Sequence, residues 1–200
     1  MHWIWKSNFK KFNTLGKVLL CLLIVFVATI RVFASNEISW MKNKSGQVHF
    51  SMTDGTAYDV KLHLGVDGVF YDKRKHELGE SEYVSLFQVS PSKSGSPLGL
   101  CGAGNEIWLH VYPITGTALT EITRTLVSSC LHSISMASQN SGTAMQDQDF
   151  SSVQWNLQGF SIEWFEQRDA AGRSLQFSNF VLHDGVFLQQ DVVSQEHSNQ

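Results

Sequence analysis

The sequence predicts an all-β protein: an antiparallel β-sandwich or open barrel, braced by one disulfide and preceded by an N-terminal signal peptide. Three observations support this fold class. Apolar and polar residues alternate with period two over most of the chain after position 46. Asp-Gly pairs at 54–55, 67–68 and 184–185 supply turn signals between these runs. The same part of the sequence has no heptad pattern, no repeat of fixed period and no convincing amphipathic helix.

Residues 1–34 have the pattern of a secretory signal peptide. Lysines precede an apolar run over 18–30, and Val32 and Ala34 are small residues at the positions that a signal peptidase reads. The run is about thirteen residues long, whereas a helix needs about twenty to span a bilayer, which disfavours a retained membrane anchor. A lipoprotein is disfavoured because Cys21 lies at the start of the run. We therefore expect cleavage after Ala34 and a periplasmic or extracellular protein.

The remaining chain predicts a single β-rich domain over 35–193 and a disordered tail over 194–200. All 18 acidic residues follow position 34, but five of the 15 basic residues precede it, which leaves 10 basic against 18 acidic groups and a net charge of −8. This charge disfavours nucleic acid and anionic lipid as partners and favours a protein with a basic surface. The alternative is that the charge only keeps an exported protein soluble.

Cys101 and Cys130 are the only cysteines after the predicted leader. In an oxidising compartment two such residues form a disulfide by default. Closing this loop would stabilise the fold by about 3–4 kcal/mol on the chain-entropy account. The alternative, a reactive or metal-binding thiol, lacks a C-x-x-C arrangement and any metal-type spacing with histidine.

Alternation and turn residues divide the domain into short strands. In chain order the expected strands are 47–52, 58–66, 69–71, 83–89, 107–112, 121–127, 131–136, 153–158, 160–164, 175–177, 180–182 and 186–188. Residues 35–43 predict a loosely ordered start, and the charged run 73–77 predicts a solvated loop tip. The polar stretch 137–152 predicts a long loop that is mobile or functional. Gly159 predicts a bulge or sharp bend within a continuing strand.

A glycine-rich turn around Cys101 leads into the strand that carries the candidate contact residues. Gly102 and Gly104 permit a positive φ or a close approach of the backbone to another group. The G-x-x-G-x-G spacing, with strand-like residues after it, does not fit a dinucleotide-binding fingerprint. Apolar residues of the next strand alternate with a second row of side chains, which are Glu106, Trp108, His110 and Tyr112. This row either faces outward, with Trp108 as a binding anchor, or is covered by other parts of the fold.

Motifs for catalysis or metal binding are missing from the sequence. The seven histidines after the leader do not form H-E-x-x-H or another short ligand spacing, and the chain has no G-x-S-x-G elbow and no P-loop. We therefore expect no catalytic residues, no metal and no cofactor. A hydrolase is the alternative, in which the disulfide brings Glu106 or His110 near Ser129 or His132 for acid–base chemistry.

The Cys-Gly-Ala-Gly turn at 101–104 and the later Ser-Cys-Leu at 129–131 are similar to a pattern in uncharacterised exported bacterial proteins. The resemblance covers the middle third of the chain. It implies export, and it implies neither an activity nor site residues.

These observations predict an exported, non-enzymatic binding protein. Exposed aromatic residues beside acidic groups are favoured at binding hot spots. The expected contact residues are Gly102, Gly104, Glu106, Trp108, His110 and Tyr112. One concrete form is an inhibitor or immunity-type protein that blocks a basic, envelope-targeting enzyme. The alternatives are the exported hydrolase and a structural envelope component, the latter if the leader is retained.

Overall fold

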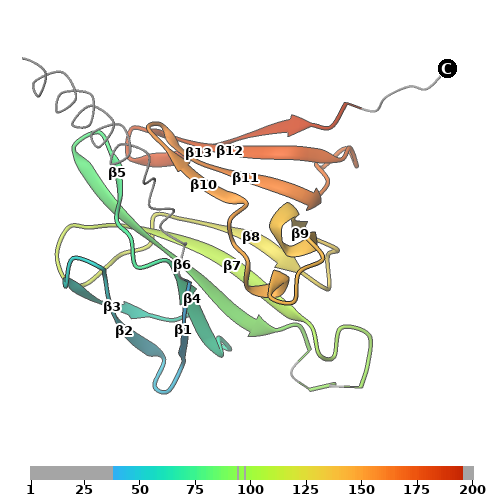
Figure 1. Cartoon of the computed structure of the whole chain (residues 1–200), viewed down its shortest axis with the longest axis horizontal. Coiled ribbons are helices and arrows are strands. Elements are labelled where there is room, and N and C mark those ends of the chain that lie inside the picture. Colours follow the sequence, from blue (N-terminus) through green and yellow to red (C-terminus); the bar gives the residue numbers. More distant parts are fainter. Residues whose placement is uncertain (1–37, 94, 97, 196–200) are drawn as a thin grey trace, which may run out of the picture. The chain divides into compact units, whose positions relative to one another are not determined.

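The computed structural model describes residues 38–93, 95–96 and 98–195 (Figure 1). These residues belong to one compact unit. The predicted signal peptide and residues 196–200 of the predicted tail lie outside the described residues. In the described part of the chain, no helix has both the length and the apolar character that crossing a membrane requires.

The described chain is almost entirely antiparallel β-structure, which confirms the predicted fold class. Its elements are β1 (Ser39–Lys42), β2 (Gln47–Ser51), β3 (Ala57–Lys61), β4 (Gly68–Tyr71), β5 (His76–Leu78), β6 (Ser81–Pro91), β7 (Asn105–Pro113), β8 (Thr123–Ser129), β9 (Ser135–Met136), the 3-10 helices η1 (Ala137–Asn140) and η2 (Gln146–Gln148), β10 (Val153–Asn156), β11 (Gly159–Glu166), β12 (Leu175–His183) and β13 (Val186–Val193).

The strands form two main sheets and one separate hairpin. The N-terminal sheet has the order β1-β4-β6-β7-β8, with β5 beside β6. The C-terminal sheet has the order β10-β11-β12-β13, with β9 beside β11, and β2 pairs with β3 alone. Figure 1 shows the orange and red strands of the C-terminal sheet on one side of the green strands β6 and β7, and the β2–β3 hairpin on the other.

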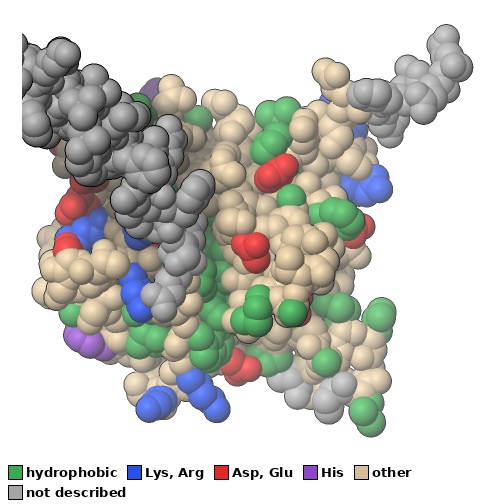
Figure 2. Space-filling model, viewed as in Figure 1, with side chains coloured by type: hydrophobic (Ala, Val, Ile, Leu, Met, Phe, Trp, Pro, Cys, Tyr) green, Lys and Arg blue, Asp and Glu red, His purple; other side chains and the backbone are tan. Residues whose placement is uncertain are grey.

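The first core lies between the two main sheets. Phe87 and Leu109 come from the N-terminal sheet, Phe160 and Phe180 come from the C-terminal sheet, and all four are buried. The rings of Phe160 and Phe180 stack with their centroids 4.5 Å apart. Hydrophobic side chains gather along the seam between these sheets (Figure 2).

The second core lies on the other face of the N-terminal sheet, beneath the β2–β3 hairpin. Phe50 and Val60 of the hairpin pack there with Leu86 and Tyr112. The N-terminal sheet is therefore covered on both faces. This explains why residues 83–89 of β6 are all buried and form a nearly continuous apolar run, because a strand without a solvated face does not need polar residues at alternate positions.

Several strand boundaries differ from the sequence-based expectation because pairing partners decide them. β1 and β5 are strands where a loose start and a loop tip were predicted, since β1 pairs with β4 and β5 pairs with β6. β3 ends at Lys61, although the alternation continues to Val66. Of the predicted strand 131–136, only Ser135–Met136 pairs with β11. A local pattern cannot show where a neighbouring edge begins or ends.

Of the two alternatives predicted at Gly159, the bulge is wrong, and the sharp bend is a complete reversal of the chain between two strands. The chain reverses at Leu157 and Gln158, and Asn156 of β10 pairs with Gly159 of β11. Gly159 has φ +152°, and a Cβ there would lie 1.9 Å from the carbonyl oxygen of Phe180. The glycine is needed because β12, the paired neighbour of β11 in the same sheet, brings its backbone too close to this position for a side chain.

The stretch 137–152 contains the two 3-10 helices and is fastened at both ends. The Ser138 hydroxyl donates to the Asp149 carbonyl at 2.7 Å, and the Ser138 N–H donates to the Ser152 hydroxyl at 2.8 Å. Phe150 is buried and stacks on Phe87 with centroids 4.0 Å apart. The stretch thus contributes a side chain to the first core.

Candidate functional site

The glycine-rich turn is tied to the end of β8 by the predicted disulfide. Cys101 and Cys130 are bonded, with their Cα atoms 5.7 Å apart. The left-handed residue of the turn is Cys101 itself, with φ 58°, and neither Gly102 nor Gly104 adopts a positive φ. Gly104 instead allows a close approach, since a Cβ there would lie 2.7 Å from Cys130 Cβ. The disulfide and the close approach are confirmed.

Glu106 holds this turn together. Its Oε1 accepts a hydrogen bond from the Ser92 hydroxyl at 2.5 Å and one from the Leu131 N–H at 3.3 Å. The carboxylate thereby joins the segments on either side of the disulfide. Glu106 therefore has a structural role, because both of its hydrogen bonds hold the turn in position.

Trp108 is half-buried and lines a cleft of about 440 Å³. Leu126 and Ile134 contribute apolar wall, and Glu166 contributes a carboxylate. The guanidinium of Arg124 lies 5.4 Å from the Trp108 ring centroid, within the range of a cation–π contact. Trp108 can therefore still be reached by a ligand, although a neighbouring cation already contacts its ring.

The second row of side chains in β7 is accessible to solvent only at Glu106 and Trp108. His110 and Tyr112 are only 2% and 3% exposed. In the β6–β7 register, Leu86 pairs with His110 and Val84 with Tyr112, so these side chains share the face that the β2–β3 hairpin covers. A folded partner cannot contact either residue directly.

His110 belongs to a cluster that the sequence analysis did not identify. Its Nδ1 lies 2.6 Å from Oε2 of Glu121, and Nε2 of His63 lies 2.9 Å from the same oxygen. The three nitrogen and oxygen atoms lie within 4.8 Å of one another. His63 follows β3, His110 is in β7 and Glu121 precedes β8, so no short spacing in the sequence marks the group.

The charges of this cluster are set by burial and by its hydrogen bonds. Burial lowers the pKa of His110 and outweighs the opposing effect of Glu121. Burial alone would raise the pKa of Glu121, but the hydrogen bonds from His63 and His110 together place it below its ordinary value. The arrangement therefore favours a neutral imidazole beside an ionised carboxylate.

A buried amide supports the cluster from β6. Oε1 of Gln88 accepts the backbone N–H of His63 at 3.0 Å, and its Nε2 donates to the Tyr112 hydroxyl at 3.1 Å. Gln88 is 1% exposed. Because a buried amide is costly unless it is hydrogen-bonded, this residue fixes the position of the loop that carries His63.

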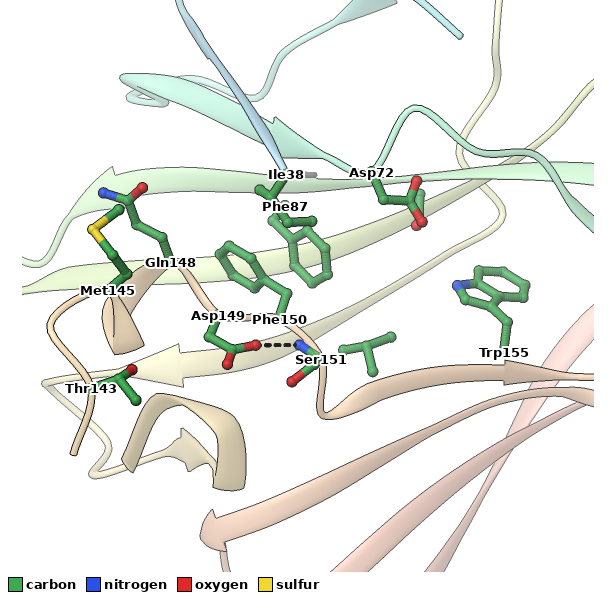
Figure 3. A pocket seen from close by; sticks show the side chains of 12 residues that line it. Ile38, Asp72, Phe87, Thr143, Met145, Gln148, Asp149, Phe150, Ser151 and Trp155 are labelled. Carbon is green, nitrogen blue, oxygen red and sulfur yellow. Dashed lines mark hydrogen bonds between the residues drawn. The ribbon is translucent and has the colours of Figure 1, made fainter. Parts of the chain in front are cut away.

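A second cleft, of about 360 Å³, opens at the seam between the two sheets. Figure 3 shows Ile38, Phe87 and Phe150 gathered on one side of it and Trp155 on another. Oδ1 of Asp149 accepts the Ser151 N–H at 2.9 Å. The cleft is an opening in the first core, with an apolar floor.

The residue pairs suggested for a hydrolase do not form in the described structure. The Ser129 hydroxyl accepts the His132 N–H at 2.9 Å, while His110 bonds to Glu121. Among the side chains that the structure describes, no hydrogen bond joins Glu106 or His110 to Ser129 or His132.

An exposed apolar strand lies at the far edge of the C-terminal sheet. β13 pairs with β12 on one side, and no other described strand pairs with it. Val186, Leu188 and Val192 are 51%, 49% and 42% exposed and point to the same face because they alternate along the strand. Phe165 of β11 is 65% exposed. We refer to Val186, Leu188 and Val192, with the unpaired side of β13, as the β13 edge.

The net negative charge of the described chain is concentrated in the part that contains β13, because few basic residues lie there. Residues 131–195 contain seven acidic and two basic side chains, a net charge of −5, whereas residues 38–130 contain nine and eight, a net charge of −1. The β13 edge therefore lies in the most acidic part of the described chain.

No family model matches the chain, and no curated protein or solved structure matches it either.

Proposed function

We propose that this protein is an exported, non-enzymatic binding protein that takes up an extended segment of a basic partner protein at the β13 edge. The observation that carries the proposal is an eight-residue edge strand with three exposed apolar side chains on one face. Edge strands are commonly protected by proline, by lysine or by being short. β13 contains neither proline nor lysine, and its only charged residue is Asp191.

Strand addition fits this edge physically. An incoming strand gains affinity from main-chain hydrogen bonds and specificity from contacts with alternate side chains. Val186, Leu188 and Val192 provide those alternate contacts. The strand already exists in the free protein, so little ordering of β13 is required on binding.

Charge favours a basic partner. The net charge of −5 on residues 131–195 attracts a basic surface and accelerates encounter with it. A second copy of the chain would bring the same negative charge to the edge, which disfavours self-pairing. The disulfide between Cys101 and Cys130 supports an oxidising compartment, and an inhibitor or immunity-type role against a basic envelope-targeting enzyme is the form we favour.

Site-specific photo-crosslinking tests the proposal. A photoreactive residue at Leu188 should form an adduct with a basic protein in envelope extract at low salt, and high salt should weaken the adduct because screening removes the attraction. The matched control is the same residue at Leu157, which is 91% exposed in the β10–β11 turn. The captured partner is then purified and titrated against the wild type, Leu188→Lys and Leu157→Lys.

We expect Leu188→Lys to weaken the binary complex by at least about tenfold, the loss of a central interface side chain, and Leu157→Lys to leave it unchanged. Equal labelling from both positions would contradict the proposal. So would an adduct formed only with a second copy of the chain, or a partner whose affinity is the same for both variants.

A further inference from the structure

We propose that His63, His110 and Glu121 form a binding site for a divalent transition-metal ion of the zinc class. The proposal is independent of the β13 edge, since the cluster lies beside the β2–β3 hairpin and uses none of the edge residues. Nothing in the sequence motifs assigns a metal to this chain.

The donor atoms already converge without an ion. Nδ1 of His110 and Nε2 of His63 both point at Oε2 of Glu121, at 2.6 and 2.9 Å. The two imidazole rings lie with centroids 4.9 Å apart. The same two nitrogens and the same carboxylate oxygen would bind the ion. The ion would therefore replace the two hydrogen bonds that now join the two histidines to Glu121.

The donor set selects the kind of ion. Two imidazole nitrogens and one carboxylate oxygen suit zinc and its neighbours in the transition series, whereas calcium and magnesium prefer oxygen ligands alone. Zinc bonds of about 2.0–2.2 Å in a tetrahedral arrangement place ligand atoms about 3.3 Å apart. The cluster must therefore open by roughly half an ångström around Glu121 to admit the ion.

The two histidines have different roles: His110 would hold the ion in a fixed position, and His63 would move to let it enter. The side chain of His110 is 3% exposed and fixed within β7, while that of His63 is 46% exposed on the loop after β3. His63 can move outward by the small distance required, and the hydrogen bond from its N–H to Gln88 keeps the loop in place. Solvent reaches the cluster from the His63 side, which leaves a fourth coordination position for water.

The loop that carries Glu121 is also held against the hairpin. The Asp59 N–H donates to the Thr117 carbonyl at 3.2 Å, and Asp59 forms a parallel bridge with Ala118. His63 and Glu121 thus both sit on loops that are tied to folded strands. Such support around the ligands is what raises metal affinity in proteins.

Isothermal titration with zinc chloride tests the site. The probe protein is the untagged product of the full-length gene, dialysed against a chelator, because a histidine tag would bind the ion. The variants are His63→Ala and Glu121→Gln, and the matched control is His49→Ala, whose ring faces only one carboxylate, Asp59, at 3.0 Å. Circular dichroism checks that each variant is folded, and cobalt substitution reports the geometry through its visible absorption.

We expect one zinc ion per chain, a rise in Tm with zinc concentration, and tetrahedral cobalt bands. His63→Ala and Glu121→Gln should each weaken zinc binding by about tenfold or more, because losing a ligand costs at least as much as losing a group that only supports one. His49→Ala should leave zinc binding unchanged. Magnesium chloride should produce no saturable signal. Absence of saturable zinc binding overturns the proposal, and so does equal binding by folded His63→Ala, which would assign the ion to adventitious surface groups.

Discussion

At the scale of single residues, two positions show how closely parts of the backbone approach one another. Gly104 lies against the disulfide, and Gly159 lies close to the carbonyl of Phe180 in the neighbouring strand β12. Each position excludes a side chain for a reason that depends on a distant segment. Tyr112 shows a different constraint, because its hydroxyl must find a partner inside the second core, which Gln88 provides.

Gly104→Ala should destabilise the protein by about 1–3 kcal/mol, the usual cost of forcing a methyl group into a packed site. The new Cβ would lie 2.7 Å from Cys130 Cβ, which the disulfide holds in place. Urea unfolding measures the loss. Gly116→Ala is the control because a Cβ there meets nothing within 4 Å. Equal stabilities of the two variants would contradict the packing that we describe.

Tyr112 should make the protein sensitive to alkaline pH. Burial, together with the nearby Glu121 carboxylate, raises the pKa of Tyr112 above its ordinary value. The unfolded chain ionises this group near pH 10 and the folded chain does not, so its stabilising effect is complete below about pH 10 and declines above it.

Tyr112→Phe tests that expectation. Below about pH 10 the variant is less stable because Nε2 of Gln88 loses its partner, a cost of about 1–3 kcal/mol. Its Tm should nevertheless fall less steeply than that of the wild type between about pH 9 and pH 11, because the variant lacks the tyrosine hydroxyl whose pKa is raised in the folded state. If the Tm of the wild type and that of the variant fall in parallel over this range, the pKa of Tyr112 is not raised by burial as we expect.

At the scale of elements, the strands differ in how many partners and cross-links hold them in place. The disulfide joins the turn before β7 to the end of β8, and Glu106 reinforces it from β7. β13, by contrast, has one partner among the described strands. The strands β7 and β8 are therefore cross-linked, whereas β13 has one side without a described partner.

Replacing both Cys101 and Cys130 by serine should reduce the free energy of unfolding by about 3–4 kcal/mol, because the unfolded chain regains the freedom that a closed loop removes. Urea unfolding with and without a reducing agent measures this. The reductant should lower the stability of the wild type to that of the double variant and leave the variant itself unchanged. A wild type insensitive to reduction, despite free thiols after treatment, would contradict a stabilising role.

At the scale of the whole described domain, the N-terminal sheet connects both hydrophobic cores. Phe87 and Leu109 face the C-terminal sheet, while Leu86 and Tyr112 face the β2–β3 hairpin. Neither core can lose its packing without exposing a face of this shared sheet. The net negative charge is distributed unevenly over the same domain, with −5 on residues 131–195 and −1 on residues 38–130.

We therefore expect a single cooperative unfolding transition. Tryptophan fluorescence and far-UV circular dichroism should give coincident urea curves, as two-state unfolding requires. Phe50→Ala removes a buried ring of the hairpin core, and it should shift both curves together by about 3–5 kcal/mol. If the hairpin instead unfolds in a separate transition, the two probes will diverge in this variant.

The sequence by itself determined the all-β class, most strand positions after residue 46 and the disulfide. These follow from local causes: alternation with period two, turn residues between strands, and only two cysteines after residue 34. At Gly159 the sequence left a bulge or a sharp bend open, because a glycine within an alternating run fits both, and only the pairing of Asn156 with Gly159 shows that the chain reverses there.

The tertiary structure alone decided which faces of the strands are covered. His110 and Tyr112 were placed in a row open to solvent or beneath other parts of the fold, and the β2–β3 hairpin settles that choice by packing over them. The same packing brings His63 and Glu121 to His110 from separate loops. These contacts join residues far apart in the chain, and their energies depend on how whole layers stack, which alternation within one strand does not encode.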